Sequence, residues 1–205
     1  MKIIIATQNQ GKAREIRALF SPPDWAVSSL RDEGYTDEVD ETGATFMENA
    51  AIKAREWAKR FKNTGAAVLA DDSGLMIDAL NGEPGVDSAN FMGRETPYEV
   101  RNAHIISKLA NAADRSAKFV CVIACAFPSG VMLTTEGEIV GEIAAETGGT
   151  GGFGYDPIFF LPEMGKTMAE LSPSEKNKIS HRGMALTQMI EAITDENFIN
   201  QRHPQ

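Results

Sequence analysis

Hydrophobic residues recur along the chain with the two spacings that are typical of strands and helices. The apolar run at residues 2–6 predicts a buried strand. Apolar residues within 12–20 share one helical face, so a helix is expected there. Residues 25–30 predict a second strand, and the acidic stretch at 31–43 predicts a loop.

The next helix is indicated by both its cap and its apolar stripe. Thr45 and Glu48 have the spacing of a capping box. Five apolar residues follow at helical spacing: Phe46, Ala50, Ala54, Trp57 and Phe61. Residues 66–70 then predict a buried strand that ends directly before two aspartates, and residues 75–80 predict its continuation.

Strand patterns dominate the second half of the chain. A helix is expected from Thr96, with Pro97 as its first residue. Residues 118–143 predict a meander of three strands, and a strand at 157–161 follows a glycine cluster. A helical region is expected over 172–193. Because helices and strands alternate early and strands cluster later, we expect an α/β fold with a mixed sheet.

Length and charge limit the classes of function. The chain has 205 residues, which favours a single domain over residues 1–205 with a polar tail from about residue 195. The net charge is −9, from 20 basic and 29 acidic residues, so nucleic acid and anionic membranes are not expected partners. A small phosphorylated ligand remains possible, because cations can gather locally.

The sequence also favours a reduced, cytoplasmic environment. It begins with an apolar run too short for a signal peptide, and no stretch approaches the roughly 20 apolar residues of a membrane helix. Cys121 and Cys125 lie four residues apart in a predicted strand, about 13 Å along it. That separation exceeds the roughly 7 Å limit for a disulfide, so buried free thiols are expected.

Two familiar phosphate motifs are matched only in part. Residues 149–154 fit G-x-G-x-x-G, but a strand-like segment follows where a dinucleotide site requires a helix. Gly165-Lys166-Thr167 resembles the end of a P-loop, but Phe160 occupies the position of its first glycine. Neither a nicotinamide site nor a P-loop is expected.

Three segments carry candidate chemistry. Residues Thr7–Lys12 join a strand to a helix, where free N–H groups and the helix dipole favour an anion; the alternative is a solvated turn shaped by Asn9 and Gly11. Asp71 and Asp72 end a buried strand, where paired carboxylates suit Mg²⁺ or a proton transfer from water; the alternative is a capped turn.

The third segment, residues 176–182, gathers several polar side chains with donor capacity in an acidic chain. Arg182 within it has the forked donors that suit a phosphate or a carbonyl edge, although a solvated helix face is the alternative. Phe153, between two glycines, has a ring on which a base can stack, or is simply a core residue. The carboxylates Asp40 and Glu41 alone indicate only an acidic loop.

Five segments in this order resemble one family. They are ATQNQGKARE, ETGATFMENAAIKA, ADDSGL, GGTGGFGYDPIF and LSPSEKNKISHRG. Together they are similar to the inosine/xanthosine triphosphate pyrophosphatases, and the resemblance runs from about residue 3 to residue 190.

The resemblance implies a two-lobed α/β fold with a long mixed sheet, flanking helices and a central substrate cleft. It implies a cytoplasmic homodimer that requires Mg²⁺ and converts ITP, dITP and XTP to the monophosphate and pyrophosphate. Such an enzyme removes non-standard purine nucleotides from the nucleotide pool.

The resemblance also assigns roles to residues. Asp72 is the catalytic carboxylate, and Mg²⁺ is held by Asp72 and Glu41, with Asp40 as the alternative to Glu41. The substrate contacts implied are Thr7, Gln8, Asn9, Gln10, Gly11, Lys12, Lys53, Ser73, Phe153, Gly154, Tyr155, Asp156, Lys176, His181 and Arg182. Donors near His181 and Arg182 would face the 6-keto group of the purine, and Lys12, Lys53, Lys176 and Arg182 would converge on one cleft.

Two other functions remain as alternatives. One is a related pyrophosphatase with another base preference, such as modified pyrimidines or dUTP. The other is a nucleotide-binding sensor that does not hydrolyse its ligand, which the Asp71–Asp72 pair argues against.

Overall fold

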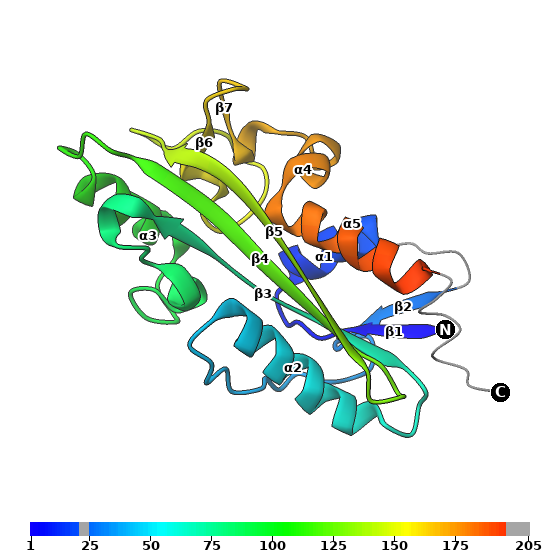
Figure 1. The fold of residues 1–205 in the computed structure, drawn as a ribbon. Coiled ribbons are helices and arrows are strands. Elements are labelled where there is room, and N and C mark those ends of the chain that lie inside the picture. Colours follow the sequence, from blue (N-terminus) through cyan, green and yellow to red (C-terminus); the bar gives the residue numbers. More distant parts are fainter. Residues whose placement is uncertain (21–24, 196–205) are drawn as a thin grey trace. The chain divides into compact units, whose positions relative to one another are not determined.

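The computed structural model describes residues 1–20 and 25–195 (Figure 1). Within these residues, seven strands form a mixed sheet in the order β2-β1-β3-β4-β5-β6-β7. The chain divides into two compact units. Unit 1 contains Met1–Asp72, Cys121–Gly137 and the described residues from Arg182 onward, and unit 2 contains Ser73–Val120 and Glu138–His181. The mixed sheet and the two units agree with the expected two-lobed α/β fold.

Unit 1 is built on parallel strands covered on both faces. Its complete elements are β1 (Lys2–Ile5), α1 (Gln10–Leu19), β2 (Ala26–Ser29) and α2 (Phe46–Phe61). β1 pairs in parallel with β2 and with β3 (Ala67–Ile77). Helices α1 and α5 (His181–Thr194) lie on one face of these strands, and α2 lies on the other (Figure 1).

The period of two along each strand explains how both faces become buried. Ile3 and Ile5 point to the face of α1 and α5, where they join a core that contains Ile16 and Met189. Ile4, which points the other way, is also fully buried. Strands buried on both faces are continuous apolar runs, as the run at 2–6 is.

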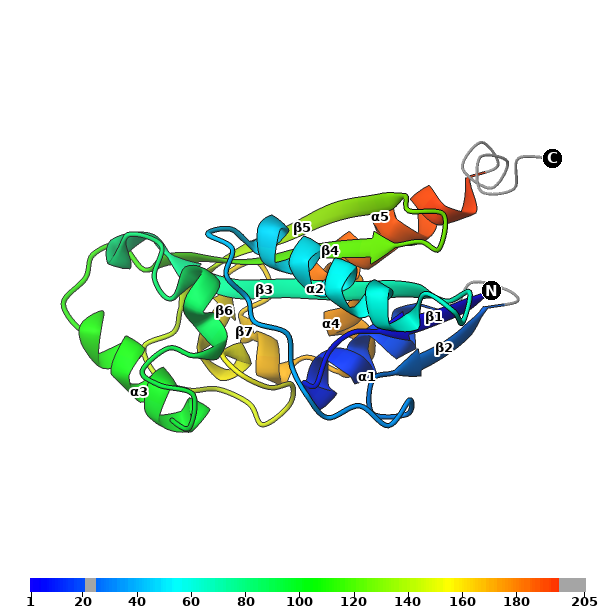
Figure 2. The same ribbon diagram turned by 90° about the horizontal axis from the view of Figure 1, so that it is seen from below.

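Helix α2 confirms the cap and the stripe predicted from the sequence. The Thr45 side chain accepts the Glu48 N–H, and all five stripe residues are buried. The Tyr35 ring packs edge-on against Trp57 and Phe61, with centroids 5.2 and 5.1 Å apart. Seen from below, α2 runs along the near face of the sheet (Figure 2).

Unit 2 has its own core. Its complete elements are α3 (Tyr98–Lys108), β6 (Phe159–Leu161), β7 (Lys166–Thr167) and α4 (Pro173–Ile179), and it shares β3, β4 (Ser116–Ala126) and β5 (Met132–Ile143) with unit 1. β6 pairs antiparallel with β5 and β7. The core includes Leu75, Ile105, Phe159 and Met168, all of which are completely buried.

Several boundaries differ from the sequence prediction. Residues 78–80 form a 3-10 turn rather than strand, ended by Asn81 in the left-handed region. Pro97 is the cap of α3 rather than its first residue. The second and third strands of the expected meander are one strand, β5. Outward and inward positions alternate strictly from Leu133 to Ile143, and Gly137, which lies between the two predicted strands, is on the inward side.

The last helical region is divided in two. Ser180 has extended backbone and ends α4, so α5 begins at His181. β7 was missed because two residues carry no period, and its presence agrees with the absence of a P-loop at Gly165–Thr167. The polar tail after Asp195 lies outside the described residues.

The remaining general expectations concern the cysteines and membranes. Cys121 and Cys125 are free and buried, and burial raises the pKa of Cys121 to about 12. Among the described residues, no helix combines the length and apolarity needed to cross a membrane.

Gly141 in β5 is a position where the fold admits no side chain. A Cβ atom there would lie 2.4 Å from the Phe160 carbonyl oxygen and 2.7 Å from the Phe159 ring. We expect Gly141→Ala to lower the free energy of unfolding by about 1–3 kcal/mol, measured by urea denaturation. The control is Val140→Thr at the neighbouring position, which is 67% exposed, with an expected change within about 0.5 kcal/mol. Equal stability of the two variants would contradict this packing.

Candidate active site

The site is organised by two consecutive aspartates in β3. Successive side chains of a strand point to opposite faces of the sheet. Asp71 therefore lies on the face of α1 and α5, and Asp72 lies on the face of α2. The two carboxylates have different partners and different electrostatic environments, although they are adjacent in sequence.

Asp71 is the centre of a buried ion-pair network. Its carboxylate is fully buried and lies 3.1 Å from the Lys12 ammonium and 3.2 Å from the Arg182 guanidinium. Arg182, only 2% exposed, also binds Glu15 of α1. Burial alone would raise the pKa of Asp71, but Lys12 and Arg182 outweigh it and hold the pKa well below its ordinary value.

Asp72 belongs to a second group on the other face. The Lys53 ammonium of α2 lies 3.6 Å from Asp72 and 3.1 Å from Glu41. Burial raises the pKa of Asp72, Lys53 and Lys12 oppose this, and Glu41 and Asp71 add to it, so the net shift is upward. Burial lowers the pKa of Lys53, but the charges of Asp72, Asp71 and Glu41 raise it by more, so the net shift of this pKa is upward. Asp72 is thus the less stabilised carboxylate of the pair.

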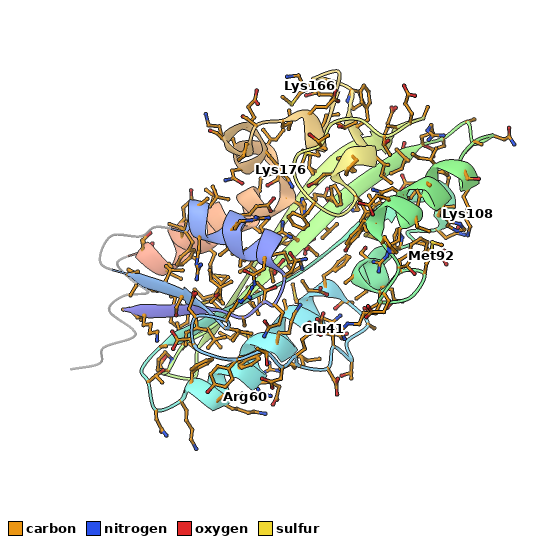
Figure 3. The ribbon with its side chains drawn as sticks, turned by 180° about the vertical axis from the view of Figure 1, so that it is seen from behind. Glu41, Arg60, Met92, Lys108, Lys166 and Lys176 are labelled. Atoms are coloured by element: carbon orange, nitrogen blue, oxygen red, sulfur yellow. The ribbon has the colours of Figure 1, made fainter. Side chains whose placement is uncertain are left out.

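The acidic loop that carries Glu41 is held by α2. The Gly43 N–H donates to the Asn49 side chain at 2.8 Å, and a Cβ at Gly43 would lie 2.6 Å from the Glu48 Cβ. Glu41 lies in the loop leading into α2 (Figure 3). In the part of the chain that the structure describes, Lys53 pairs with Glu41 and not with Asp40; that Glu41 is the metal carboxylate stays a prediction.

The loop from Thr7 to Lys12 forms the beginning of α1. The Asn9 side chain caps the helix by accepting the Gly11 and Lys12 N–H groups, at 2.9 and 3.1 Å. The Asn9 N–H in turn donates to the Thr7 hydroxyl. Two helix N–H groups that were expected to face an anion therefore donate to Asn9 instead. The charged side chain that this loop brings to the site is Lys12.

The amides of Gln8 and Gln10 are also engaged. Gln8 donates to the carbonyls of Tyr35 and Asp37, and Gln10 donates to the Gln8 carbonyl. These bonds brace the loop against the segment before α2. That Gln8 and Gln10 bind substrate stays a prediction.

A second group of site residues lies in unit 2. Asp156, 3% exposed, accepts the Phe153 N–H at 2.7 Å and binds the ammonium of Lys176. The same ammonium lies 4.8 Å from the centroid of the Phe153 ring. A Cβ at Gly152 would lie 2.1 Å from an Asp156 carboxylate oxygen, so the turn around this carboxylate requires glycine. The glycine cluster leads into a 3-10 turn at Asp156–Ile158, so the strand expected at 157–161 begins only at Phe159.

Three other residues predicted to contact substrate, all in unit 2, have different surroundings. The His181 ring stacks on Phe119 with centroids 4.8 Å apart. Tyr155 is a core residue whose hydroxyl donates to the Ser88 carbonyl, and burial raises its pKa to about 12. Ser73 is half-buried within β3. Contacts from these three side chains to a substrate remain predictions.

The four cations predicted to converge are distributed between the units. Lys12, Lys53 and Arg182 gather around Asp71 and Asp72 in unit 1, whereas Lys176 pairs with Asp156 in unit 2. Convergence on one cleft therefore stays a prediction. Glu15 and Asn49 were not singled out from the sequence, because a helix-face glutamate and a helix asparagine carry no signal until their partners are known.

The protein is thus an α/β protein with a mixed sheet. Its strand β3 carries two carboxylates, and cations from the flanking helices bind both of them. The chain belongs to the Ham1 family, whose family model matches residues 3–192. This agrees with the resemblance found in the sequence.

Curated relatives match almost the whole chain. The chain is 50% identical to the dITP/XTP pyrophosphatase of an Exiguobacterium species, over 94% of this chain and 97% of that protein. It is 45% identical to the dITP/XTP pyrophosphatase of Thermus thermophilus, over 95% and 93%. Among solved structures, the Staphylococcus aureus Ham1 protein is similar with a TM-score of 0.83 and 41% identity, covering 94% of this chain and 98% of that one.

The two aspartates should differ in their effect on stability. Asp71→Asn leaves the buried Arg182 and Lys12 without their shared carboxylate, so we expect the free energy of unfolding to fall by about 3–5 kcal/mol at pH 7. Asp72→Asn leaves Lys53 paired with Glu41, and the change should stay within about 1 kcal/mol. Urea denaturation followed by circular dichroism measures both. A larger loss of unfolding free energy for Asp72→Asn than for Asp71→Asn would disprove that Asp71 is the carboxylate that stabilises the fold.

Proposed function

We propose that this protein is an Mg²⁺-dependent nucleoside triphosphate pyrophosphatase that hydrolyses dITP, XTP and ITP to the monophosphate and pyrophosphate. The names of its relatives support this substrate class, and pool cleansing follows from it. The main observation behind this proposal is that the two aspartates of β3 have different partners. Asp71 is neutralised by cations, whereas Asp72 shares Lys53 with Glu41 at a slightly more exposed and less stabilised position.

The residues around Asp72 suit a magnesium ion. Mg²⁺ prefers oxygen ligands and is commonly held by one or two carboxylates together with substrate phosphates and water. Asp72 and Glu41 reach one ammonium, that of Lys53, so their oxygens approach a common point. The described residues hold no cluster of three or more potential ligands, which fits a cation bound partly by substrate. When bound, Mg²⁺ would offset the charge on the phosphoryl oxygens.

The protein side chains then divide the remaining work. Asp72 positions the attacking water and accepts its proton as the water adds to the α-phosphorus. Lys12 and Lys53 offset negative charge on the phosphates and on the departing pyrophosphate. Asp71, bound by Lys12 and Arg182, holds Lys12 at the end of the loop from Thr7. Catalysis is mainly positioning and charge stabilisation.

Base selection is assigned to the group in unit 2. The Phe153 ring offers a stacking surface, and Lys176 beside it is a hydrogen-bond donor. A donor suits the 6-keto group of hypoxanthine and xanthine and opposes the 6-amino group of adenine, which discriminates strongly when the site is buried. Arg182, predicted to face this group, is instead occupied by Asp71 and Glu15, so Lys176 is the better candidate.

We further propose that the protein is a cytoplasmic homodimer. The resemblance noted in the sequence and the free, buried cysteines support this assembly and compartment. Light scattering coupled to size-exclusion chromatography, run across a range of protein concentrations, measures the oligomeric state.

The first test is an assay of nucleoside triphosphates for pyrophosphate release. We expect wild-type protein to convert ITP, dITP and XTP with Mg²⁺ and to lose this activity with EDTA. Asp72→Asn should lower kcat by about 10²–10³ or more while remaining folded. Release from dUTP but not ITP would support the alternative base preference. Binding of ITP without hydrolysis would support a sensor.

A second test concerns the stacking ring. Base–aromatic stacking contributes about 1–3 kcal/mol by alanine substitution, so Phe153→Ala should raise KM for ITP about 5- to 150-fold. Phe153→Tyr retains the ring and should stay within threefold of wild type. An unchanged KM in Phe153→Ala would remove the ring from base binding.

A further inference from the structure

The beginning of α3 contacts the base-binding loop, here defined as residues 152–156. Asn102 is 3% exposed and donates its side-chain N–H to the Gly154 carbonyl at 3.1 Å. The Tyr98 ring packs edge-on against Tyr155, with centroids 5.1 Å apart and planes at 88°. Two consecutive residues of the loop, Gly154 and Tyr155, are thus held by one helix.

Arg101, between these two residues, is a buried cation that binds backbone instead of a carboxylate. It is 1% exposed and donates to the carbonyls of Ser88, Ala89, Gly93 and Arg94. Its guanidinium also lies 4.7 Å from the Tyr98 ring centroid. The segment it binds carries Met92 and lies beside α3 (Figure 3).

These bonds connect the loop to the strand that carries the aspartates. The Ser88 carbonyl accepts both Arg101 and the Tyr155 hydroxyl, and the Ser88 hydroxyl accepts the Leu75 N–H of β3 at 2.9 Å. Buried polar groups in one connected network restrict one another to a single arrangement. The base-binding loop is therefore fixed from α3 and β3 together, within unit 2.

We propose that Asn102 is a positioning residue for nucleotide binding, supported by Tyr98 and Arg101. It acts through the Gly154 carbonyl, which fixes the backbone between Phe153 and Asp156. This inference rests on the proposed base-binding role of Phe153. Helix α3, which lies outside the glycine-rich segment, would then position the residues that bind the base.

The test compares binding with turnover. Loss of one hydrogen bond to a carbonyl corresponds to about a three- to tenfold change in affinity. Asn102→Ala should therefore raise KM for ITP and Kd for IMP, measured by calorimetry, about three- to tenfold. Because the proposed role of the loop is to bind the base and not to act on the reacting phosphorus, kcat should change less than twofold. Tyr98→Leu, at a half-exposed position, should shift KM and Kd in the same direction.

The matched control is Ile105→Val, which truncates a fully buried residue of the same helix but keeps both the Asn102–Gly154 hydrogen bond and the Tyr98 ring. It should lower Tm but leave KM and Kd within twofold of wild type. If Asn102→Ala does not fold, Tyr98→Leu decides. Variants that lower only kcat, or that shift Kd no more than Ile105→Val, overturn the proposal.

Failure of the proposed function is distinguishable from failure of this inference. Wild-type protein that binds IMP but releases no pyrophosphate from ITP refutes the enzyme function, while the Kd of Asn102→Ala still tests the positioning role. Wild-type protein that binds no IMP refutes both.

Discussion

The alternation of side chains along β3 is the constraint on which the site depends. A strand buried on both faces must place adjacent aspartates on opposite sides, and each buried charge then requires a cation from its own side. Lys12 and Arg182 from α1 and α5 meet Asp71, and Lys53 from α2 meets Asp72. The three helices that cover the sheet are therefore also the helices that supply the charges.

This arrangement gives two like residues unlike chemistry. Asp71, fully buried and bound by two cations, has a lowered pKa and stays ionised as a fixed part of the structure. Asp72 shares Lys53 with Glu41 and is disfavoured as an anion by burial and by its neighbours. A carboxylate with incomplete compensation is the one that gains from a metal ion or a proton. The proposed catalytic role of Asp72 and the structural role of Asp71 are thus separated by geometry, not by residue type.

The sequence predicted those elements whose period is long and whose caps are local. The stripe of α2 and the cap at Thr45 are confirmed because both signals lie within one helix. The continuity of β5 was missed because Glu136 and Gly137 separate its two apolar segments, and residues 78–80 were assigned to a strand because their turn depends on the left-handed Asn81. The candidate site was predicted as a set of residues, but the pairing of Glu15 with Arg182 and of Asn49 with Gly43 required the fold.

The partners of Arg182 could not be predicted from the sequence. A free arginine near a histidine suits a base edge, and the sequence gives no means of knowing that Asp71, 111 residues earlier, occupies it. In the structure, Arg182 binds Asp71 and Glu15. The hydrogen-bond donor beside the Phe153 ring is Lys176, which is oriented by its ion pair with Asp156. The same carboxylate accepts the Phe153 N–H, so ring and donor are set by one residue. In the proposed role of this loop, selectivity for the base depends on how firmly the loop is held by the residues that pack against it.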